Sequence, residues 1–175
     1  MNRFTFSLAS FQIKKQEAPT TPEGKAIAEI EKSGGSVRPL AQNDDRLEVT
    51  FSLQGASVTD KDLAPLGQLR KVAHLSLART SITDAAMAHV EKHTGIVKLH
   101  LEQTKITDAA LVRLKPLQQL EYLNLYNTAV TDAGLMHLSG LKSLKNIYVW
   151  QTKVTAEGAK KLKAALPSVD INLGW

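Results

Sequence analysis

The sequence contains no cysteine among its 175 residues. This absence excludes disulfide bonds, thiolate catalysis, zinc sites built on cysteine and covalent haem attachment through a C-x-x-C-H motif. It also removes the usual indication of redox compartment, because a cysteine-free protein is compatible with either side of a membrane.

Long hydrophobic runs are missing as well. No stretch approaches the roughly 20 apolar residues that a membrane-spanning helix needs, so we expect no membrane span in this chain. Hydrophobic residues nevertheless make up 43% of the sequence and charged residues 22%, with a mean hydropathy of -0.17. This balance predicts one globular domain with a substantial core.

Acidic residues are outnumbered by basic ones, and the net charge is +5. The densest basic run consists of Lys160, Lys161 and Lys163. No aromatic residues alternate with these lysines, as they do in proteins that bind single-stranded nucleic acid. We therefore interpret the run as a solvated helix face and do not expect a nucleic-acid partner.

The N-terminal segment does not form a signal-peptide pattern, because Thr5, Ser7 and Ser10 interrupt its short apolar stretch. We expect residues 1–20 to be a flexible leader. The prolines and threonines of EAPTTPEG then mark the link into ordered structure.

A 24-residue repeat dominates the rest of the chain. The triplet Val58-Thr59-Asp60 recurs at 82–84, 106–108 and 130–132, and a weaker copy stands at 154–156. Each unit has two apolar residues at alternate positions, as in a strand, followed by a helical series such as Leu111, Leu114, Leu117 and Leu120.

The pattern L-x-L-x-x-T-x-[IV]-T-D, continued by leucines at every third position, resembles the leucine-rich repeat. The resemblance implies an α/β right-handed solenoid with a parallel sheet on its concave face and helices on its convex face. Threonines 80, 104, 128 and 152 stand where many such repeats have asparagine, and we expect their hydroxyls to satisfy buried backbone groups. Each Thr-Asp pair is expected to begin a helix, with the aspartate at the positive end of the helix dipole.

Residues 21–50 are predicted to cap the first repeat. The segment from Pro22 to Gly35 has a helical pattern, and 36–40 and 46–53 are interpreted as two strands of a hairpin. Residues 51–175 then form five repeats and a final strand at 171–173, whose outer edge is exposed.

The period predicts which side chains the sheet displays. Phe51 and Leu53 are aligned with Leu75 and Leu77, so Ser52 and Gln54 are expected to face outward with their counterparts in later repeats. All three tyrosines and both tryptophans fall on displayed positions. Exposed Tyr and Trp are typical of contact sites, although neighbouring rings also cover a sheet by packing across strands. The predicted partner-binding residues are Tyr122, Asn124, Tyr126, Tyr148, Trp150, Gln151, His100, Glu102 and Trp175.

The histidines give no firm chemical assignment. His89 and His93 have a helical spacing of four, but His93 aligns with leucines and is expected to be partly buried. His74, His100 and Glu102 are a somewhat better ligand set without a nucleophile or an enclosed pocket. We therefore predict no metal, no cofactor and no enzymatic activity.

The run LEYLNLYNTAVTDAGLMHLSGLKSLKNIYVWQTKVT and the ending LPSVDINLGW resemble the C-terminal repeat domain of planctomycete-type cytochrome c proteins, which carry ribonuclease-inhibitor-like repeats. Members of that family have membrane segments and a haem c domain before the repeats, and this chain has neither. The resemblance implies a bacterial cell-envelope or periplasmic location.

These observations favour a non-enzymatic recognition module that binds a protein through the concave aromatic face. Two alternatives remain open at this point. Rings flanked by amides also suit carbohydrates, and the repeats could instead serve a purely structural role within a larger envelope protein.

Overall fold

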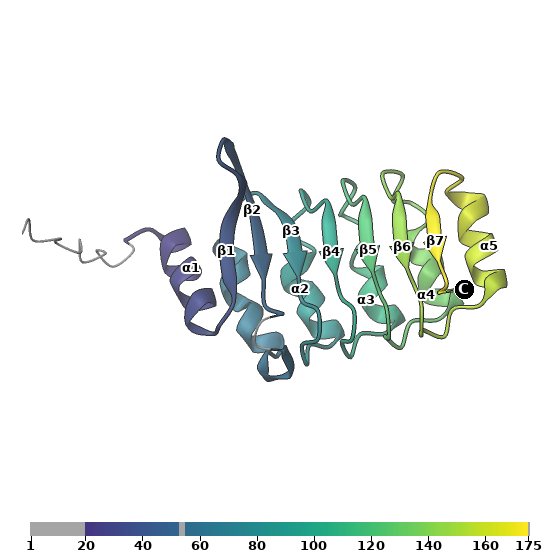
Figure 1. The fold of residues 1–175 in the computed structure, drawn as a ribbon, viewed down its shortest axis with the longest axis horizontal. Helices are drawn as coiled ribbons and strands as arrows, with labels where there is room; N and C mark the ends of the chain where they lie inside the picture. The colour runs from purple at the N-terminus through teal and green to yellow at the C-terminus, as the bar shows by residue number, and fades with distance from the viewer. Residues whose placement is uncertain (1–19, 53–54, 175) are drawn as a thin grey trace, which may run out of the picture.

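The structure is a computed structural model, and it describes residues 20–52 and 55–174. A single sheet runs through it, with strands β1 to β7 in the order of the sequence (Figure 1). Strands β1 and β2 form an antiparallel hairpin, and every later strand is parallel to its neighbour. The strands are β1 (Ser36–Ala41), β2 (Asp44–Thr50), β3 (Val72–Ser76), β4 (Lys98–His100), β5 (Tyr122–Asn124), β6 (Asn146–Tyr148) and β7 (Asp170–Asn172).

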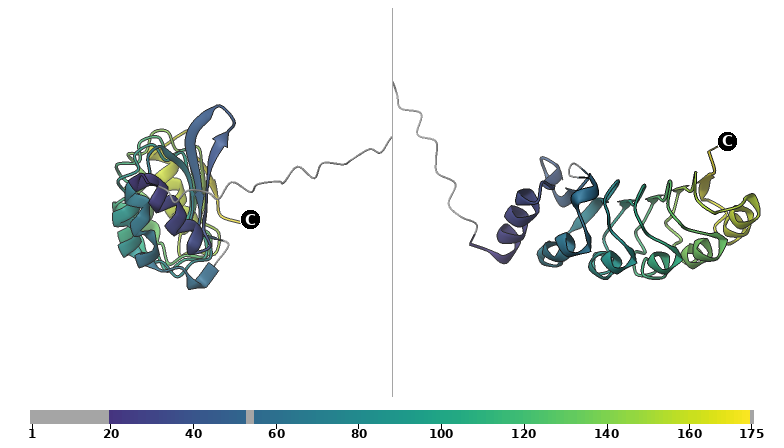
Figure 2. Two further views of the ribbon diagram at one scale, coloured as in Figure 1. Left: turned by 90° about the vertical axis from the view of Figure 1, so that its left-hand side faces the viewer. Right: turned by 90° about the horizontal axis from the view of Figure 1, so that it is seen from below.

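Helical segments cover one side of this sheet. Figure 2 shows the strands lining the inner side of a shallow curve, with the helices on the outer side. The α-helices are α1 (Pro22–Lys32), α2 (Met87–Val90), α3 (Asp108–Val112), α4 (Asp132–Leu135) and α5 (Ala156–Ala165), and the 3-10 helices are η1 (Gly55–Ser57), η2 (Asp60–Gln68), η3 (Asp84–Ala86) and η4 (Met136–Leu138). Because a strand and a short helical segment alternate from one repeat to the next, the fold is the expected α/β solenoid.

Stacked apolar rows form the core between the two layers. Leu75, Leu99, Leu123 and Ile147 lie opposite one another on successive strands and are fully buried. The leucines of the helical series are buried behind them. One unit cannot bury its apolar side alone, so each repeat depends on the next.

The predicted register is confirmed from β3 to β7 and is wrong for β2. Val49, not Phe51, lies opposite Leu75, and Thr50 takes the position expected for Ser52. The hairpin explains the difference, because β2 is already aligned with β1 through Val49 and Val37. Leu53 and Gln54 lie outside the described residues.

The threonine ladder forms as predicted. The hydroxyls of residues 80, 104, 128 and 152 each donate to the backbone carbonyl three residues earlier, at 2.5–2.7 Å. The first three threonines are buried. Each hydroxyl thereby satisfies a carbonyl that the turn out of the strand would otherwise leave without a partner.

The aspartates have a role that the sequence did not predict. Asp60 accepts from both the backbone N–H and the hydroxyl of Thr83, which belongs to the next repeat. The same pair of bonds joins 84 to 107, 108 to 131 and 132 to 155, all at 2.6–2.8 Å. The threonine hydroxyls also accept from N–H groups of their own helices, as expected for caps.

This Asp–Thr ladder explains small residues inside the helices. A Cβ added at Gly134 would lie 2.0 Å from Oδ1 of Asp108, and one at Gly158 would lie 1.9 Å from Oδ1 of Asp132. The carboxylate of one repeat therefore occupies the space beside the helix of the next. The fifth unit has Ala156 in place of the aspartate and offers no carboxylate to a further unit.

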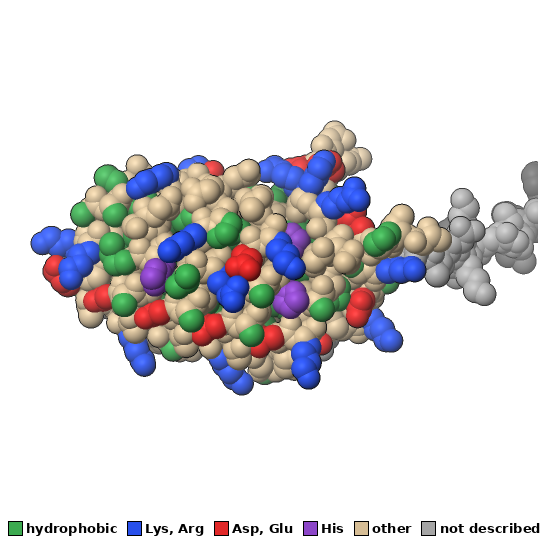
Figure 3. Space-filling view, turned by 180° about the vertical axis from the view of Figure 1, so that it is seen from behind, with side chains coloured by type: hydrophobic (Ala, Val, Ile, Leu, Met, Phe, Trp, Pro, Cys, Tyr) green, Lys and Arg blue, Asp and Glu red, His purple; other side chains and the backbone are tan. Residues whose placement is uncertain are grey.

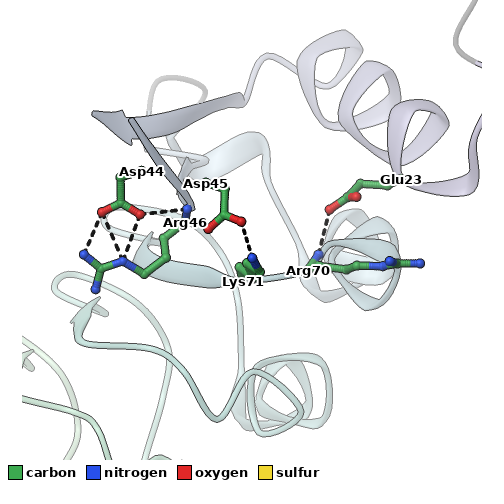
Figure 4. Close-up of polar contacts among 6 residues, drawn as sticks. All are labelled: Glu23, Asp44, Asp45, Arg46, Arg70 and Lys71. Atoms are coloured by element: carbon green, nitrogen blue, oxygen red, sulfur yellow. Dashed lines mark hydrogen bonds and ion pairs between the residues drawn. The ribbon is translucent and has the colours of Figure 1, made fainter. Parts of the chain in front are cut away.

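The N-terminal cap consists of α1 and the β1–β2 hairpin. Ala26 and Ile30 of α1 are buried in the core. Figure 4 shows the polar contacts at this end, where Glu23 accepts from the backbone N–H of Arg70 and Asp45 pairs with Lys71. The predicted helix plus hairpin is therefore present, although β2 ends at Thr50 rather than at residue 53.

None of the helices in the described ranges has the length and apolar character needed to cross a membrane. The predicted leader, residues 1–20, lies outside these ranges except for Thr20.

Candidate functional site

The inner face of the sheet presents aligned rows of side chains. One row contains His74, Lys98, Tyr122, Asn146 and Asp170, and the next contains Ser76, His100, Asn124, Tyr148 and Asn172. Parallel strands in register place equivalent residues about 4.8 Å apart, so side chains of neighbouring repeats meet across each row.

A stacked pair of rings stands just after β5 and β6. The ring centroids of Tyr126 and Trp150 are 4.7 Å apart, with an angle of 25° between the ring planes. Trp150 remains 46% exposed, more than any other large hydrophobic side chain in the described residues. A Cβ at Gly174 would lie 2.1 Å from Cδ1 of this indole, so only a glycine lets the ring lie on that backbone.

A second aromatic run crosses the middle of the face. The His100 and Tyr122 rings are 4.9 Å apart, and the Tyr122 and Tyr148 rings are 5.3 Å apart. Burial raises the pKa of the Tyr122 hydroxyl, and Tyr148 and Glu102 raise it further. This hydroxyl is therefore protonated at neutral pH. Among the described residues the predicted aromatic patch thus forms two clusters, and the more exposed ring, that of Trp150, belongs to the stacked pair.

The predicted polar residues lie around these rings in different roles. Asn124 Oδ1 accepts from the backbone N–H of Tyr126, at 3.0 Å, and so holds the turn that carries that ring. Gln151 is exposed and has a backbone φ of 54°. Trp175 lies outside the described residues.

A left-handed backbone conformation recurs at the position of Gln151. Arg79, Gln103 and Asn127 share it with φ between 52° and 62°, and Gly55 has φ 55° in the first unit. Non-glycine residues pay a steric cost of about 1–2 kcal/mol there. The result is a row of exposed polar side chains along the end of the strands.

His100 and Glu102 are within hydrogen-bond distance on the displayed face, with 3.2 Å between Nδ1 and Oε1. The second carboxylate oxygen of Glu102 is buried and has no hydrogen-bond partner among the described residues. The predicted site residues from β4 to β6 therefore lie together, but as neighbours on an open sheet.

A hollow of about 400 Å³ occupies the other half of the same face, between the hairpin and β4. Its lining includes Arg38, Glu48, His74, Ser76, Lys98 and His100. The repeat spacing placed His74 beside Lys98, but nothing in the spacing brings Arg38 of β1 to the same place. Sequence reasoning therefore missed this feature.

No group of three His, Asp or Glu side chains comes together as a metal site within residues 20–52 and 55–174. His93 was expected to be partly buried and is buried, at the repeat position of core leucines 69, 117 and 141. Burial lowers its pKa, so its imidazole is neutral at neutral pH.

The outer face has a different character. Figure 3 shows positive and negative side chains interspersed over the helices, with apolar side chains in small separate spots. Val112 and Met136, which are 42% and 37% exposed, are its largest exposed apolar residues within the described part of the chain.

Neither the known family models nor the curated proteins contain a match to this chain. Solved structures do match. The ectodomain of the receptor kinase SOBIR1 from Arabidopsis thaliana, a leucine-rich repeat structure, has a TM-score of 0.52 at 16% identity, covering 86% of this chain and 90% of that one. An internalin, InlF of Listeria monocytogenes, has a TM-score of 0.50 at 22% identity over 62% of this chain.

The chain spans only 30% of the length of that internalin. At these identities the likeness concerns the fold. The matches do not support the resemblance to planctomycete-type cytochrome c proteins, which stays a prediction. The repeats, the parallel sheet with helices between its strands, and the matched structures together show that this chain has the leucine-rich repeat fold.

Proposed function

We propose that this chain is a non-enzymatic recognition module that binds a protein partner through the sheet face of β5 to β7. The observation that carries the proposal is the stacked Tyr126–Trp150 pair. It keeps a large ring exposed on the inner face of the sheet, which does not pack against the helices. Tyrosine and tryptophan are enriched among the residues that dominate binding energy at protein interfaces.

The surroundings of this pair support a protein site. The exposed amide of Gln151 directly follows Trp150, and Asn146 lies opposite Tyr122 in the neighbouring row. An aromatic centre with a polar rim is the usual anatomy of an interface. On the same face, Tyr122 packs against both Tyr148 and His100, and these rings are partly buried. Rigid aromatic side chains lose little conformational entropy on binding.

The absence of catalysis is part of the proposal. The displayed face is an open sheet, and Glu102 and His100 pair with each other rather than with a hydroxyl nucleophile. The matched Arabidopsis structure is the ectodomain of a receptor kinase, which is consistent with a recognition role. We also place the chain in the cell envelope, on the sequence resemblance alone.

The test is capture of partners from an extract of the source cells by the wild type and by a Tyr126→Ala/Trp150→Ala variant. A Val112→Ala/Met136→Ala variant is the matched control, because it removes two exposed apolar side chains from the helix face. Circular dichroism first establishes that all three proteins are folded.

We expect a protein that the wild type and the helix-face variant capture and that the aromatic variant loses. With that protein purified, calorimetry should show at least about a 30-fold weaker affinity for the aromatic variant, or about 2 kcal/mol. Equal capture by all three proteins would overturn the proposal.

Carbohydrate binding is the second candidate, since an exposed indole flanked by amides also suits a sugar face. Saturable quenching of tryptophan fluorescence by oligosaccharides, abolished by Trp150→Ala, would favour it. A structural role through the open edge of β7 would instead appear as dimers that Ile171→Pro removes, because proline blocks edge pairing.

A further inference from the structure

The hollow beside the hairpin is the second distinctive region of the displayed face. It is lined by residues of β1, β2, β3 and β4, and His100 belongs both to its lining and to the aromatic run. The hollow is therefore continuous with the run of His100, Tyr122 and Tyr148. A segment that lies across these rings would reach the hollow.

The charges in the hollow are unbalanced. Arg38 pairs with Glu48 at 3.0 Å, and nearby Arg46 pairs with Asp44 at 2.6 Å, so these two carboxylates are already engaged. Lys98 is exposed and makes no ion pair within the described part of the chain. The hollow thus presents the ammonium group of Lys98, the imidazole of His74 and the hydroxyl of Ser76, while the one carboxylate in its lining, Glu48, is paired with Arg38.

The pKa of His74 responds to the charges in the hollow. Burial lowers its pKa, and the positive charge of Lys98 lowers it further. The charged and titratable groups that act on it from β2 and β4 are Arg46, Glu48, Lys98 and His100, of which Glu48 raises its pKa. His74 also interacts electrostatically with Asp44, whose carboxylate is paired with Arg46. An anion placed between His74 and Lys98 would favour the charged imidazole and raise this pKa.

We propose that the hollow receives an acidic side chain of the protein partner, with Lys98, His74 and Ser76 as the groups that bind its carboxylate. This inference rests on the proposed function, because it names the chemistry of a partner segment that also covers the aromatic pair. The partner is then an extended acidic segment that crosses the strands.

The dimensions fit such a segment. Three strand spacings separate β3 from β6, roughly 14 Å. Extended chain covers about 3.3 Å per residue, so four or five residues reach from the hollow to the rings. An aromatic or apolar residue at one end and Asp or Glu at the other would engage both halves of the face.

The experiment follows the five histidines by NMR during a pH titration, with a blocked triglutamate peptide as the probe. A blocked triglutamine peptide is its uncharged counterpart, and ionic strength is held constant. Glutamate side chains stay ionised above about pH 6, so only the protein titrates in the range of interest. A His74→Gln variant assigns the His74 signal.

We expect triglutamate to raise the pKa of His74 by about 1, as an opposite charge at contact distance does. By linkage, the peptide binds about tenfold more tightly to the protonated protein. His137, on the helix face, should show no change. Lys98→Gln should abolish the shift at His74, whereas Lys105→Gln, the same change at an exposed lysine after the same strand, should retain it.

Several results would overturn the proposal: no shift with triglutamate, an equal shift with triglutamine, a shift in Lys98→Gln equal to that of wild type, or a shift with inorganic phosphate but not with triglutamate. The Tyr126→Ala/Trp150→Ala variant should still show the His74 shift. Failure of the aromatic site in its own test is therefore distinguishable from failure of the acidic site.

Discussion

Two kinds of residue rows run along this solenoid, and they differ in whether the residue type repeats. Framework rows hold neighbouring repeats together, and displayed rows lie on the inner face of the sheet. In the framework, the same residue returns at every turn, as with the aspartates that each accept two hydrogen bonds from the next threonine. In the displayed rows the residue changes at every strand, from Ser76 through His100 and Asn124 to Tyr148.

Stacking accounts for the uniform rows, since each repeat must match an equivalent surface on its neighbour. The displayed side chains meet no such surface. Their identities are therefore free to vary from strand to strand, and one sheet carries both the hollow of β1 to β4 and the stacked pair after β5 and β6.

The largest expected effect comes from breaking the Asp–Thr ladder. Asp108→Ala removes the acceptor of two hydrogen bonds from Thr131, at 2.8 and 2.6 Å. We expect it to lower the free energy of unfolding by about 2–3 kcal/mol, because bonds to a charged group are worth more than neutral ones. Asp170→Ala, on the displayed row of β7, should change it by less than about 0.5 kcal/mol. Urea denaturation measures both, and equal costs would contradict the distinction.

A smaller loss is expected in the threonine ladder. Thr104→Val keeps the shape of the side chain but leaves the Leu101 carbonyl without its 2.7 Å hydrogen bond in a buried turn. The cost should be about 1–2 kcal/mol. Thr94→Val, at an exposed position, serves as control and should cost less than about 0.5 kcal/mol in the same denaturation assay.

A glycine in the left-handed row should stabilise the protein. Gln103 has φ 56°, and Gln103→Gly relieves that strain at the expense of a more flexible unfolded chain. We expect a net gain of roughly 0.5–1 kcal/mol. Gln119→Gly, an exposed glutamine without positive φ, should lose stability by a similar amount. If both changes destabilise the protein equally, the row is not strained.

The smallest effect is expected in acid. Hydrogen bonds from Thr155 lower the pKa of Asp132, and the Arg46 side chain lowers that of Asp44 to about 2. A lowered pKa in the folded state contributes stability above the unfolded value of about 3.9, and this contribution disappears as the pH falls through the folded value. Stability should therefore fall less steeply below about pH 4 in Asp132→Asn than in wild type, by thermal denaturation across that range. An unchanged slope would contradict the pKa shift.

Most of the repeat architecture was predictable from the sequence, because its causes are local and periodic. The alternation at Leu123 and Leu125, the threonine at 128 and the Thr-Asp cap at 131 each recur in phase, and the structure confirms the strand, the buried hydroxyl and the helix start that they predict. The register of β2 was wrong because a non-repeating hairpin sets it.

The candidate site was predictable only in part. Periodicity placed Tyr126 beside Trp150, but not the angle of 25° at which their rings stack. It could not reveal that Asp60 accepts a hydrogen bond from Thr83 in the next repeat. An aspartate in the first turn of a helix is equally explained by its interaction with the dipole of its own helix.

By itself, the sequence determined the period, the buried rows and the identity of the side chains that face outward. With a fixed repeat length, residues at equivalent positions point in the same direction. Only the tertiary structure decided which of those side chains touch. The aromatic side chains separate into two clusters, and Arg38 lines the same hollow as His74 and Lys98. These arrangements depend on how side chains of different strands pack together, which the repeat pattern does not specify.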